Sequence, residues 1–577
     1  MSFTDAHSPS AVCSPTRYGL LTGRYAWRTR LQEWVIAAYE PPLITTDRPT
    51  LPRFLKKHGY YTICIGKWHL GWEWSGPQPS RMTEVPNGQA RLQWDFTKPI
   101  RAGPTERGFD YYFGVDLPNL PPFTFIENDR VVTQPTERYE VDPGEGVVLP
   151  RGFAGAPIAP GWRFQDILPE ITRRAVRKIH ERAKLDAPFF LYFSMTSPHE
   201  PIVPSKDFQG GSGIAPIADF VMQTDWSAGQ VIKAVDDADI ADDTIVIFTA
   251  DNGGNMYDRV DDTTPTSNLP LRGGKATIYE GGSRVPLVVI WPGHVEPGST
   301  SDAVVSSIDY YPTILEMLGL DAKPGVAFDG VSIVPALKGG TLAREAVFCH
   351  FPHPGVEPAR FPATSVRKGD WKLIHVWCDG PDQTDRYELY NLADDLGETN
   401  NLADAMPDKV KELDALIRRH LDETQALVPK PNPAYDPTRG PVAGWHPSSF
   451  CKLSARDGRL VVESTGGDPN LSTGNVPAVS GELVMKLRVR STSRGAAHFY
   501  WATQKGPRFR REVRLDLPIE HDGQWHEHAI EFTADSTLRA VRIDPSSAPG
   551  RIEFDRISLC RPDGTLLKEW EFDAEAR

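Results

Sequence analysis

Short apolar runs alternate with amphipathic patterns between residues 59 and 376. The runs are rich in β-branched and aromatic residues, and they predict buried strands at 60–66, 189–195, 243–250 and 286–291. Apolar residues at helical spacing predict helices at 167–184 and 309–320. Strands and helices in alternation are typical of an α/β fold with a mostly parallel sheet flanked by helices.

The pattern changes toward the C-terminus. Residues 361–376 predict an antiparallel hairpin, and residues 408–427 predict an amphipathic helix. A Pro-rich stretch follows, and beyond it apolar and polar positions alternate with a period of two, which predicts an all-β sandwich of jelly-roll type. We therefore expect an α/β domain, a small antiparallel subdomain, a linker and a β-sandwich at 1–345, 346–427, 428–446 and 447–577.

Composition narrows the class of protein. The chain has 577 residues and a net charge of −13, with no basic tract, which argues against a nucleic-acid partner. Its longest apolar runs are far shorter than a membrane span, so we expect a soluble chain with no membrane partner. The first dozen residues contain neither the basic nor the apolar part of an export signal.

The six cysteines are too few and too scattered for a disulfide scaffold or a zinc knuckle. Cys451 and Cys560 lie near opposite ends of the expected sandwich. They are a candidate disulfide pair if the protein is exported.

Polar clusters follow three of the predicted strands. Lys67 and His69 follow the first, His199 the second, and Asp251 and Asn252 the third. Because ligands bind outside the carboxyl ends of strands in open α/β sheets, we expect these clusters to converge. A cation beside an imidazole suits an anionic substrate and proton transfer, and adjacent carboxylate and amide oxygens suit calcium. Taken singly, the Asp251–Asn252 pair is more often an Asx turn that closes a strand, and the Lys67–His69 pair is more often a surface loop.

A lone cysteine stands at the head of a predicted helix in the stretch AVCSPTRYGLLTGR, with Pro15 and Arg17 shortly after Cys13. Proline is tolerated in the first turn, and a helix N-terminus attracts anions. The alternative is a buried cysteine in an ordinary helix. Lys275, in LRGGKATIYEGGSRVP, adds a further cation in a Gly-rich loop.

Taken together, these motifs resemble the sulfatase family. The run Cys13 to Arg17 is similar to its C-x-P-x-R signature, and GKWHLG, PTERGFDYYFG, SPHEP, ADNGG and LRGGKATIYEGGSRVP follow in the family's order over residues 1 to 425. The resemblance implies the alkaline phosphatase superfamily fold. It also implies oxidation of Cys13 to formylglycine by a maturation enzyme, a calcium ion, and a periplasmic or secreted location.

The resemblance also implies roles for individual residues. One hydroxyl of hydrated formylglycine attacks sulfur, Lys67 and Lys275 neutralise the sulfate oxygens, and Arg17 stabilises the Cys13 side chain. His199 donates a proton to the leaving alcohol, and His69 takes one as sulfate leaves. The ligands implied for calcium are Asp251, Asn252 and the modified Cys13. The segment 114–132 resembles loops of the galactosamine-6-sulfatase and arylsulfatase A branch, which implies a sulfated carbohydrate substrate.

The family's N-terminal strand, which ends in two consecutive aspartates, has no counterpart before Cys13. We expect that Met1 is an internal methionine of a longer protein; the alternative is a degenerate copy that binds sulfated glycans without turnover. Three other functions stay open: a phosphoester or phosphonate hydrolase of the same superfamily, a thiol hydrolase with a Cys13 thiolate, and a pure glycan-binding protein. The C-terminal sandwich is equally consistent with sugar binding and with structural packing.

Overall fold

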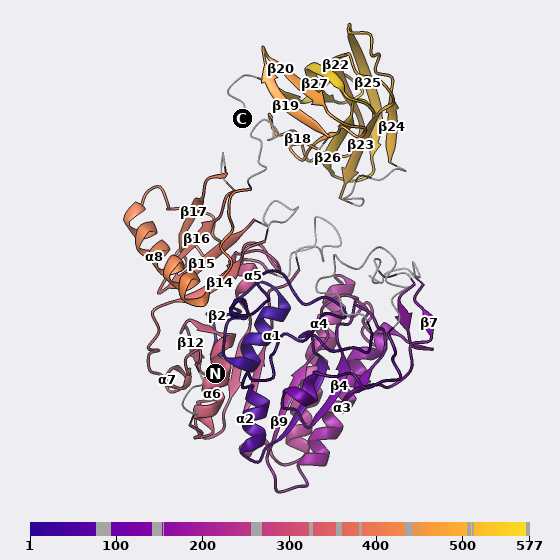
Figure 1. Cartoon of the computed structure of the whole chain (residues 1–577). Helices are drawn as coiled ribbons and strands as arrows, with labels where there is room; N and C mark the ends of the chain where they lie inside the picture. Colours follow the sequence, from indigo (N-terminus) through magenta and orange to yellow (C-terminus); the bar gives the residue numbers. More distant parts are fainter. Residues whose placement is uncertain are drawn as a thin grey trace. The chain divides into compact units, whose positions relative to one another are not determined.

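The computed structural model describes residues 1–76, 94–140, 153, 155–255, 268–321, 327–353, 361–379, 383–432, 442–448, 450–504, 509 and 513–572. The chain forms two compact units, Met1–Lys430 and Pro431–Arg577 (Figure 1). Residues 433–441 of the expected linker lie outside the described residues. None of the described helices is long and apolar enough to cross a membrane.

A five-stranded sheet in the first unit has the order β6-β5-β4-β3-β9. Its three longer strands, β4, β3 and β9, run parallel. In β3 (Tyr61–Lys67), the middle one of these three, all residues except the first are buried, which explains the continuous apolar run there. The predicted strands at 60–66 and 189–195 are thereby confirmed. The strands are β3 (Tyr61–Lys67), β4 (Tyr111–Val115), β5 (Ile126–Glu127), β6 (Arg130–Val131) and β9 (Phe189–Ser194).

A second sheet has the order β10-β11-β1-β12, and its pairing is mixed. The expectation of a mostly parallel sheet is therefore wrong for this half. Parallel neighbours need a crossover, usually a helix. Between β10 and β11 the described chain contains only the four-residue α5 (Glu280–Ser283), and the two strands pair antiparallel. The strands are β1 (Ser2–Phe3), β10 (Val246–Thr249), β11 (Leu287–Ile290) and β12 (Thr300–Ser301); β2 (Ala6–His7) pairs with β13 (Val305–Ser306), and β7 (Glu137–Arg138) with β8 (Pro157–Ile158).

The helices predicted at 167–184, 309–320 and 408–427 are confirmed as α3 (Ile167–Arg182), α6 (Tyr310–Met317) and α8 (Pro407–Thr424), and the helix predicted to begin at Cys13 is present as well. The apolar stripe of α3 packs into a core with Ile63 of β3. The other helices are α1 (Cys13–Thr22), α2 (Leu51–Lys57), α4 (Pro216–Asp237) and α7 (Val334–Leu337), with 3₁₀ turns at Ala26–Arg28, Pro104–Arg107, Phe164–Asp166, Ala241–Asp243 and Ser307–Asp309.

A four-stranded antiparallel sheet, β14-β15-β16-β17, completes the first unit, and α8 lies across it (Figure 1). Leu373 and Leu389 of the sheet and Ile417 of the helix share its core. The predicted hairpin is confirmed, because β15 and β16 pair from Lys368 and Trp371 outward. The strands are β14 (Val347–Phe351), β15 (Ala363–Lys368), β16 (Trp371–Val376) and β17 (Arg386–Asn391).

The second unit consists of two antiparallel sheets that share one core. One sheet has the order β18-β21-β26-β23-β24, and the other has the order β19-β20-β27-β22-β25, with β28 also paired to β27. Phe499 from the first sheet and Phe554 from the second are both fully buried in that core. The strands are β18 (His446–Pro447), β19 (Cys451–Arg456), β20 (Arg459–Ser464), β21 (Leu471–Thr473), β22 (Gly481–Ser491), β23 (Ala497–Thr503), β24 (Arg514–Leu517), β25 (Trp525–Ala534), β26 (Leu538–Asp544), β27 (Gly550–Cys560) and β28 (Leu566–Trp570).

The candidate disulfide is wrong, because all six cysteines are free. Cys451 lies opposite Ser464, and Ser464 lies opposite Gly550 at the start of β27, whereas Cys560 ends that strand. A strand of this length separates the cysteines by roughly 30 Å, far beyond the Cα separation that a disulfide allows. The positions of Cys451 and Cys560 in the sequence do not show which residues of the paired strands lie opposite one another.

A buried charge network joins the antiparallel subdomain to the rest of the first unit. Glu280 of α5 accepts a hydrogen bond from Lys372 Nζ at 2.8 Å and from Arg284 Nε at 2.8 Å, and its Oε2 lies 3.0 Å from His7 Nε2. Lys372 Nζ also lies 2.8 Å from Glu398 Oε1. Lys372 is thus the cation that two buried carboxylates share.

We predict that Lys372→Met lowers the free energy of unfolding of the first unit by roughly 3–5 kcal/mol, because it leaves Glu280 and Glu398 buried without their common cation. The measurement is urea denaturation followed by tryptophan fluorescence. The matched control is Lys368→Met on the same hairpin, whose partner Glu412 is exposed. Equal midpoints for the two variants would show that the network contributes nothing.

Candidate active site

Helix α1 begins at Cys13, which is 3% exposed. The preceding residue, Val12, is extended and gives no side-chain cap, so the first-turn N–H groups and the positive end of the helix dipole lie beside the cysteine. Ser14 anchors this turn: its Oγ donates to the carbonyl of His69 at 3.1 Å and accepts from the N–H of Ile36 at 3.1 Å. The helix start is therefore held in place from two directions.

Arg17, one turn into α1, connects the helix to the ends of three strands. Its Nε and Nη2 lie 2.8 Å and 2.6 Å from Asp251 Oδ2, just after β10. Its Nη1 donates to the carbonyl of Lys67 at 3.2 Å, at the end of β3, and to Ser194 Oγ, at the end of β9. Burial alone would lower the pKa of the guanidinium, but Asp251, Tyr192 and Cys13 together outweigh burial and raise it, so Arg17 stays charged.

Two lysines add positive charge to the same place. Lys67 is 2% exposed, and its pKa is lowered, chiefly by burial and further by Arg17. Cys13 and Asp251 oppose this shift but do not cancel it. Lys275, which is half-buried, acts on the pKa of Lys67 as a neighbouring cation. Three cations thus surround one carboxylate, and a chain with a net charge of −13 contains a locally positive site.

His69 is held in one tautomer. Its Nε2 lies 2.7 Å from the carbonyl of Ile36, which only accepts, so Nε2 carries the proton. Its Nδ1 is buried, has no hydrogen-bond partner in the part of the chain that the structure describes, and carries the lone pair. Burial, Lys67 and Arg17 hold the pKa of His69 well below its usual value, so the imidazole is neutral, with its lone pair at Nδ1. The residue also has a φ of +57°, a strained conformation of the kind that clusters at functional sites.

His199 has the opposite arrangement. Its Nδ1 donates to the carbonyl of Glu200 at 2.7 Å, which leaves Nε2 as the free nitrogen. Burial comes first, then Lys275 and Lys67, among the causes that hold its pKa well below the usual value. The imidazole is therefore neutral until an anion binds beside the two lysines and compensates their charge.

Asp251 and Asn252 follow β10 in a tight loop. Burial alone would raise the pKa of Asp251, but Arg17, Lys67 and Lys275 hold it well below the usual range. The loop lies against α5: Gly253 donates to the carbonyl of Gly282 at 2.9 Å, and a Cβ at Gly253 would lie 1.8 Å from the carbonyl oxygen of Gly281. Only glycine fits at this approach.

These two residues fit one side of a calcium site. Asp251 is an ionised carboxylate, and the amide oxygen of Asn252 is buried with no hydrogen-bond partner among the described residues. Calcium takes six to eight oxygens, so the pair supplies only part of a shell. The other side-chain group with metal-binding spacing in the described chain is Asp5, His7 and Glu280, whose charges are already compensated by Lys372 and arginines.

The predicted site residues come together. They lie close enough together for the charge of one residue to shift the pKa of another. This set consists of Cys13, Arg17, Lys67, His69, His199, Asp251 and Lys275, and Asn252 directly follows Asp251. Sequence reasoning missed Ser194, Ser14, Ile36 and Asp116, whose Oδ1 accepts from the N–H of His69 at 3.2 Å. Ser194 had a usable signal, since it is the polar residue that ends an apolar strand.

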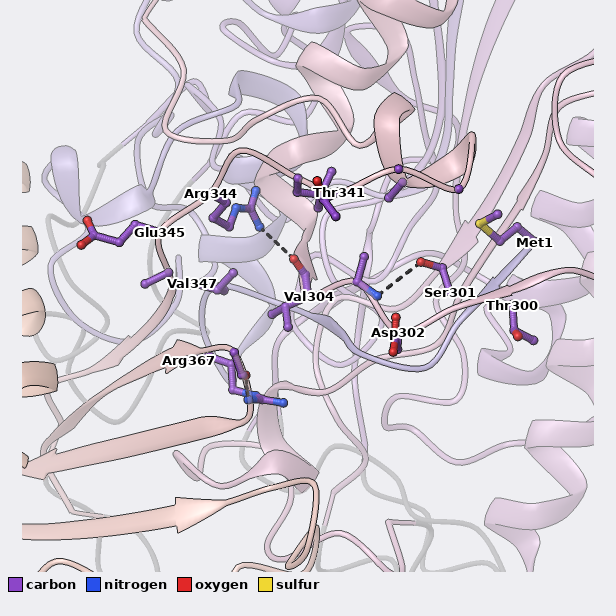
Figure 2. A pocket seen from close by; sticks show the side chains of 17 residues that line it. Met1, Thr300, Ser301, Asp302, Val304, Thr341, Arg344, Glu345, Val347 and Arg367 are labelled. Carbon is purple, nitrogen blue, oxygen red and sulfur yellow. Dashed lines mark hydrogen bonds between the residues drawn. The ribbon is translucent and has the colours of Figure 1, made fainter. Parts of the chain in front are cut away.

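A cavity of about 400 Å³ lies away from this site, between β12 and residues 336–347 (Figure 2). Arg344 and Arg367 line it, but Arg344 is paired with Asp309 and Arg367 with Asp5. Each of these arginines therefore has a carboxylate partner, whereas around Cys13 three cations share the single carboxylate of Asp251.

A buried cysteine at a helix start, with Arg17 of the same helix, Lys67 at the end of β3 and Lys275 in a Gly-rich loop nearby, suits a tetrahedral anion. Comparisons with known proteins identify the family. The model of the family described as Sulfatase matches residues 1–320, and one described as N-sulphoglucosamine sulphohydrolase, C-terminal, matches residues 274–426. The chain belongs to the sulfatase family and is a sulfatase.

Individual relatives agree. An N-acetylgalactosamine-6-O-sulfatase of Bacteroides thetaiotaomicron is 30% identical over 465 residues, covering 72% of this chain and 85% of the relative. Arylsulfatase A of Bos taurus is 29% identical, with 74% and 82% covered. A solved structure described under the metabolism of multiple glycosaminoglycans by Bacteroides thetaiotaomicron matches with a TM-score of 0.59 at 29% identity, covering 73% and 91%. The α/β part thus has the expected alkaline phosphatase-like fold.

We predict that stability depends on pH through Asp116, which is 5% exposed. Burial raises its pKa to about 6, so the unfolded chain loses this proton before the folded one, and rising pH favours unfolding. Relative to Asp116→Asn, the wild type should lose about 1 kcal/mol between about pH 5 and pH 7.5. The measurement is the denaturation midpoint of both proteins at each pH. A gap that stays constant with pH would show that Asp116 is ionised throughout.

Proposed function

We propose that this sulfatase hydrolyses sulfate esters of carbohydrates, with Cys13 converted to formylglycine and a calcium ion bound at Asp251 and Asn252. The observation that carries the proposal is the set of Arg17, Lys67 and Lys275 around a buried Cys13 at a helix N-terminus. A carbohydrate substrate is supported by the name of the N-acetylgalactosamine-6-O-sulfatase relative. Segment 114–132 supports the same choice.

Formylglycine, as its hydrate, would supply an oxygen nucleophile and a second hydroxyl for release of sulfate. Calcium would supply charge neutralisation, with its remaining ligands coming from the modified Cys13, the substrate and water. Cys13 fits the modification, because its side chain lies beside Arg17 and Lys67, which favour an electron-rich oxygen there.

The active-site residues then have separate roles in binding sulfate and in moving protons. Lys67 and Lys275 bind the sulfate oxygens, and Arg17 holds the side chain at position 13 in place. His199 takes a second proton at Nε2 once the sulfate anion has compensated the lysines, and it gives that proton to the leaving alcohol oxygen. His69 accepts a proton at Nδ1, the nitrogen left free by its bond to Ile36.

Conversion of Cys13 precedes folding in this proposal. The residue is 3% exposed at the start of α1, so a maturation enzyme reaches it only in the unfolded chain, where Pro15 and Arg17 are accessible as recognition residues. We propose a periplasmic or secreted location by family resemblance.

The experiment is sulfate release from a panel of sulfated glycans by the chain coexpressed with a formylglycine-generating enzyme. We predict release that EDTA abolishes and calcium restores, that Cys13→Ala lacks, and that iodoacetamide leaves unchanged, with mass spectrometry showing that position 13 has lost sulfur. Release that survives EDTA would contradict the calcium proposal. Iodoacetamide inactivation would indicate a thiolate nucleophile, and phosphate release without sulfate release would indicate a phosphoester hydrolase.

We further predict that the effect of His199→Ala depends on the leaving group. Loss of the general acid should lower kcat by about 10²–10⁴-fold for a sugar sulfate, whose alkoxide leaves poorly, and far less for 4-nitrophenyl sulfate, whose phenolate leaves without protonation. The measurement is steady-state kinetics on both substrates. The control is His180→Ala on α3. An equal loss on both substrates would assign His199 to binding instead of proton donation.

A further inference from the structure

Trp34 is a tryptophan at the edge of the active site that remains 42% exposed. Its place follows from its neighbours in the chain. Ile36 accepts from His69 Nε2 at 2.7 Å and donates to Ser14 Oγ at 3.1 Å. Val35 packs against a buried cluster that contains Val12 and Ala276, the residues next to Cys13 and Lys275. The indole therefore lies on a segment that is bonded to His69 and that contacts the chain neighbours of Cys13 and Lys275.

The indole is held rigidly. It stacks on His353, with ring centroids 4.6 Å apart and planes 13° from parallel, and it meets Phe351 edge-on at 5.7 Å and 81°. The backbone of Trp34 has a φ of +56°, and its N–H lies 2.9 Å from His353 Nε2. An exposed tryptophan that only covered the core would need none of these constraints.

The two stacked rings of Trp34 and His353 carry no charge. His353 is 3% exposed, and burial, followed by the charge of His350, lowers its pKa to about 3, so the imidazole beneath the indole is neutral. One indole face is covered, and much of the remaining surface is exposed beside a site for a sulfate ester. The negative face of an aromatic ring attracts weakly positive C–H groups, and a pyranose ring offers a flat surface of such groups.

We propose that Trp34 is the aromatic platform on which the sugar ring that carries the sulfate ester packs. This inference rests on the proposed carbohydrate sulfatase function and adds to it the residue that selects a cyclic, apolar-faced leaving group. Binding of the ring on Trp34 orients the ester oxygen toward the cations around Cys13. The sulfate group itself does not contact Trp34.

The test compares Trp34→Ala with Trp226→Ala, a matched control on α4 whose side chain is 38% exposed and packs on Phe208. The readouts are kcat/KM for a sulfated N-acetylgalactosamine oligosaccharide, calorimetric binding of its desulfated form, and the inhibition constant of inorganic sulfate. Trp34→Ala should weaken the first two about tenfold and leave inhibition by sulfate unchanged. Trp34→Phe, which keeps a ring, should recover most of the loss.

Each outcome decides between the proposals. Equal values for Trp34→Ala and Trp226→Ala, with an active wild type, would overturn the platform and leave the sulfatase proposal standing. A parallel weakening of inhibition by inorganic sulfate, or a lowered denaturation midpoint that Trp34→Phe shares, would assign Trp34 a structural role. A wild type that neither binds nor hydrolyses any sulfated or desulfated sugar would overturn both proposals.

Discussion

The ion pair between Arg17 and Asp251 is the interaction on which the rest of the site depends. A buried guanidinium is tolerated only when its donors are satisfied. Here Asp251, the carbonyl of Lys67 and the hydroxyl of Ser194 satisfy them from the ends of β10, β3 and β9. These strands belong to two different sheets. A single side chain on α1 therefore sets the position of Cys13, one turn earlier, against all of them.

The second constraint is the balance of charge. The chain as a whole is acidic, and at physiological ionic strength the field of distant surface carboxylates is screened within roughly 8 Å. The buried cations Arg17 and Lys67, with Lys275 nearby, are screened far less and dominate the potential at Cys13. Burial, and after it these neighbouring cations, hold the pKa values of His69 and His199 well below the usual value, so both imidazoles are neutral. These cations therefore attract an arriving sulfate anion, and the negative charge of that anion changes the proton affinity of His199.

The antiparallel subdomain contributes to the site through α5. Lys372 on β16 holds Glu280 at the start of α5, and Gly282 of α5 accepts a hydrogen bond from Gly253 in the loop that carries Asp251 and Asn252. The contact between the loop and the helix leaves no room for a side chain at Gly253. The buried charge network thus connects the antiparallel subdomain, through α5, to the loop that carries the oxygen donors.

The sequence by itself determined the elements with a strong period and the residue types of the site. The apolar run of β3, the stripe of α3 and the alternation in β22 are local properties, and strand ends followed by polar residues pointed to Lys67, His69, His199, Asp251 and Asn252. Tertiary structure decided what depends on distant contacts. The mixed pairing around β11, the separation of Cys451 from Cys560, the tautomer of His69 and the stack of Trp34 on His353 each join residues far apart in the chain. Register, hydrogen-bond direction and burial are set by packing, and no local pattern of residues encodes them.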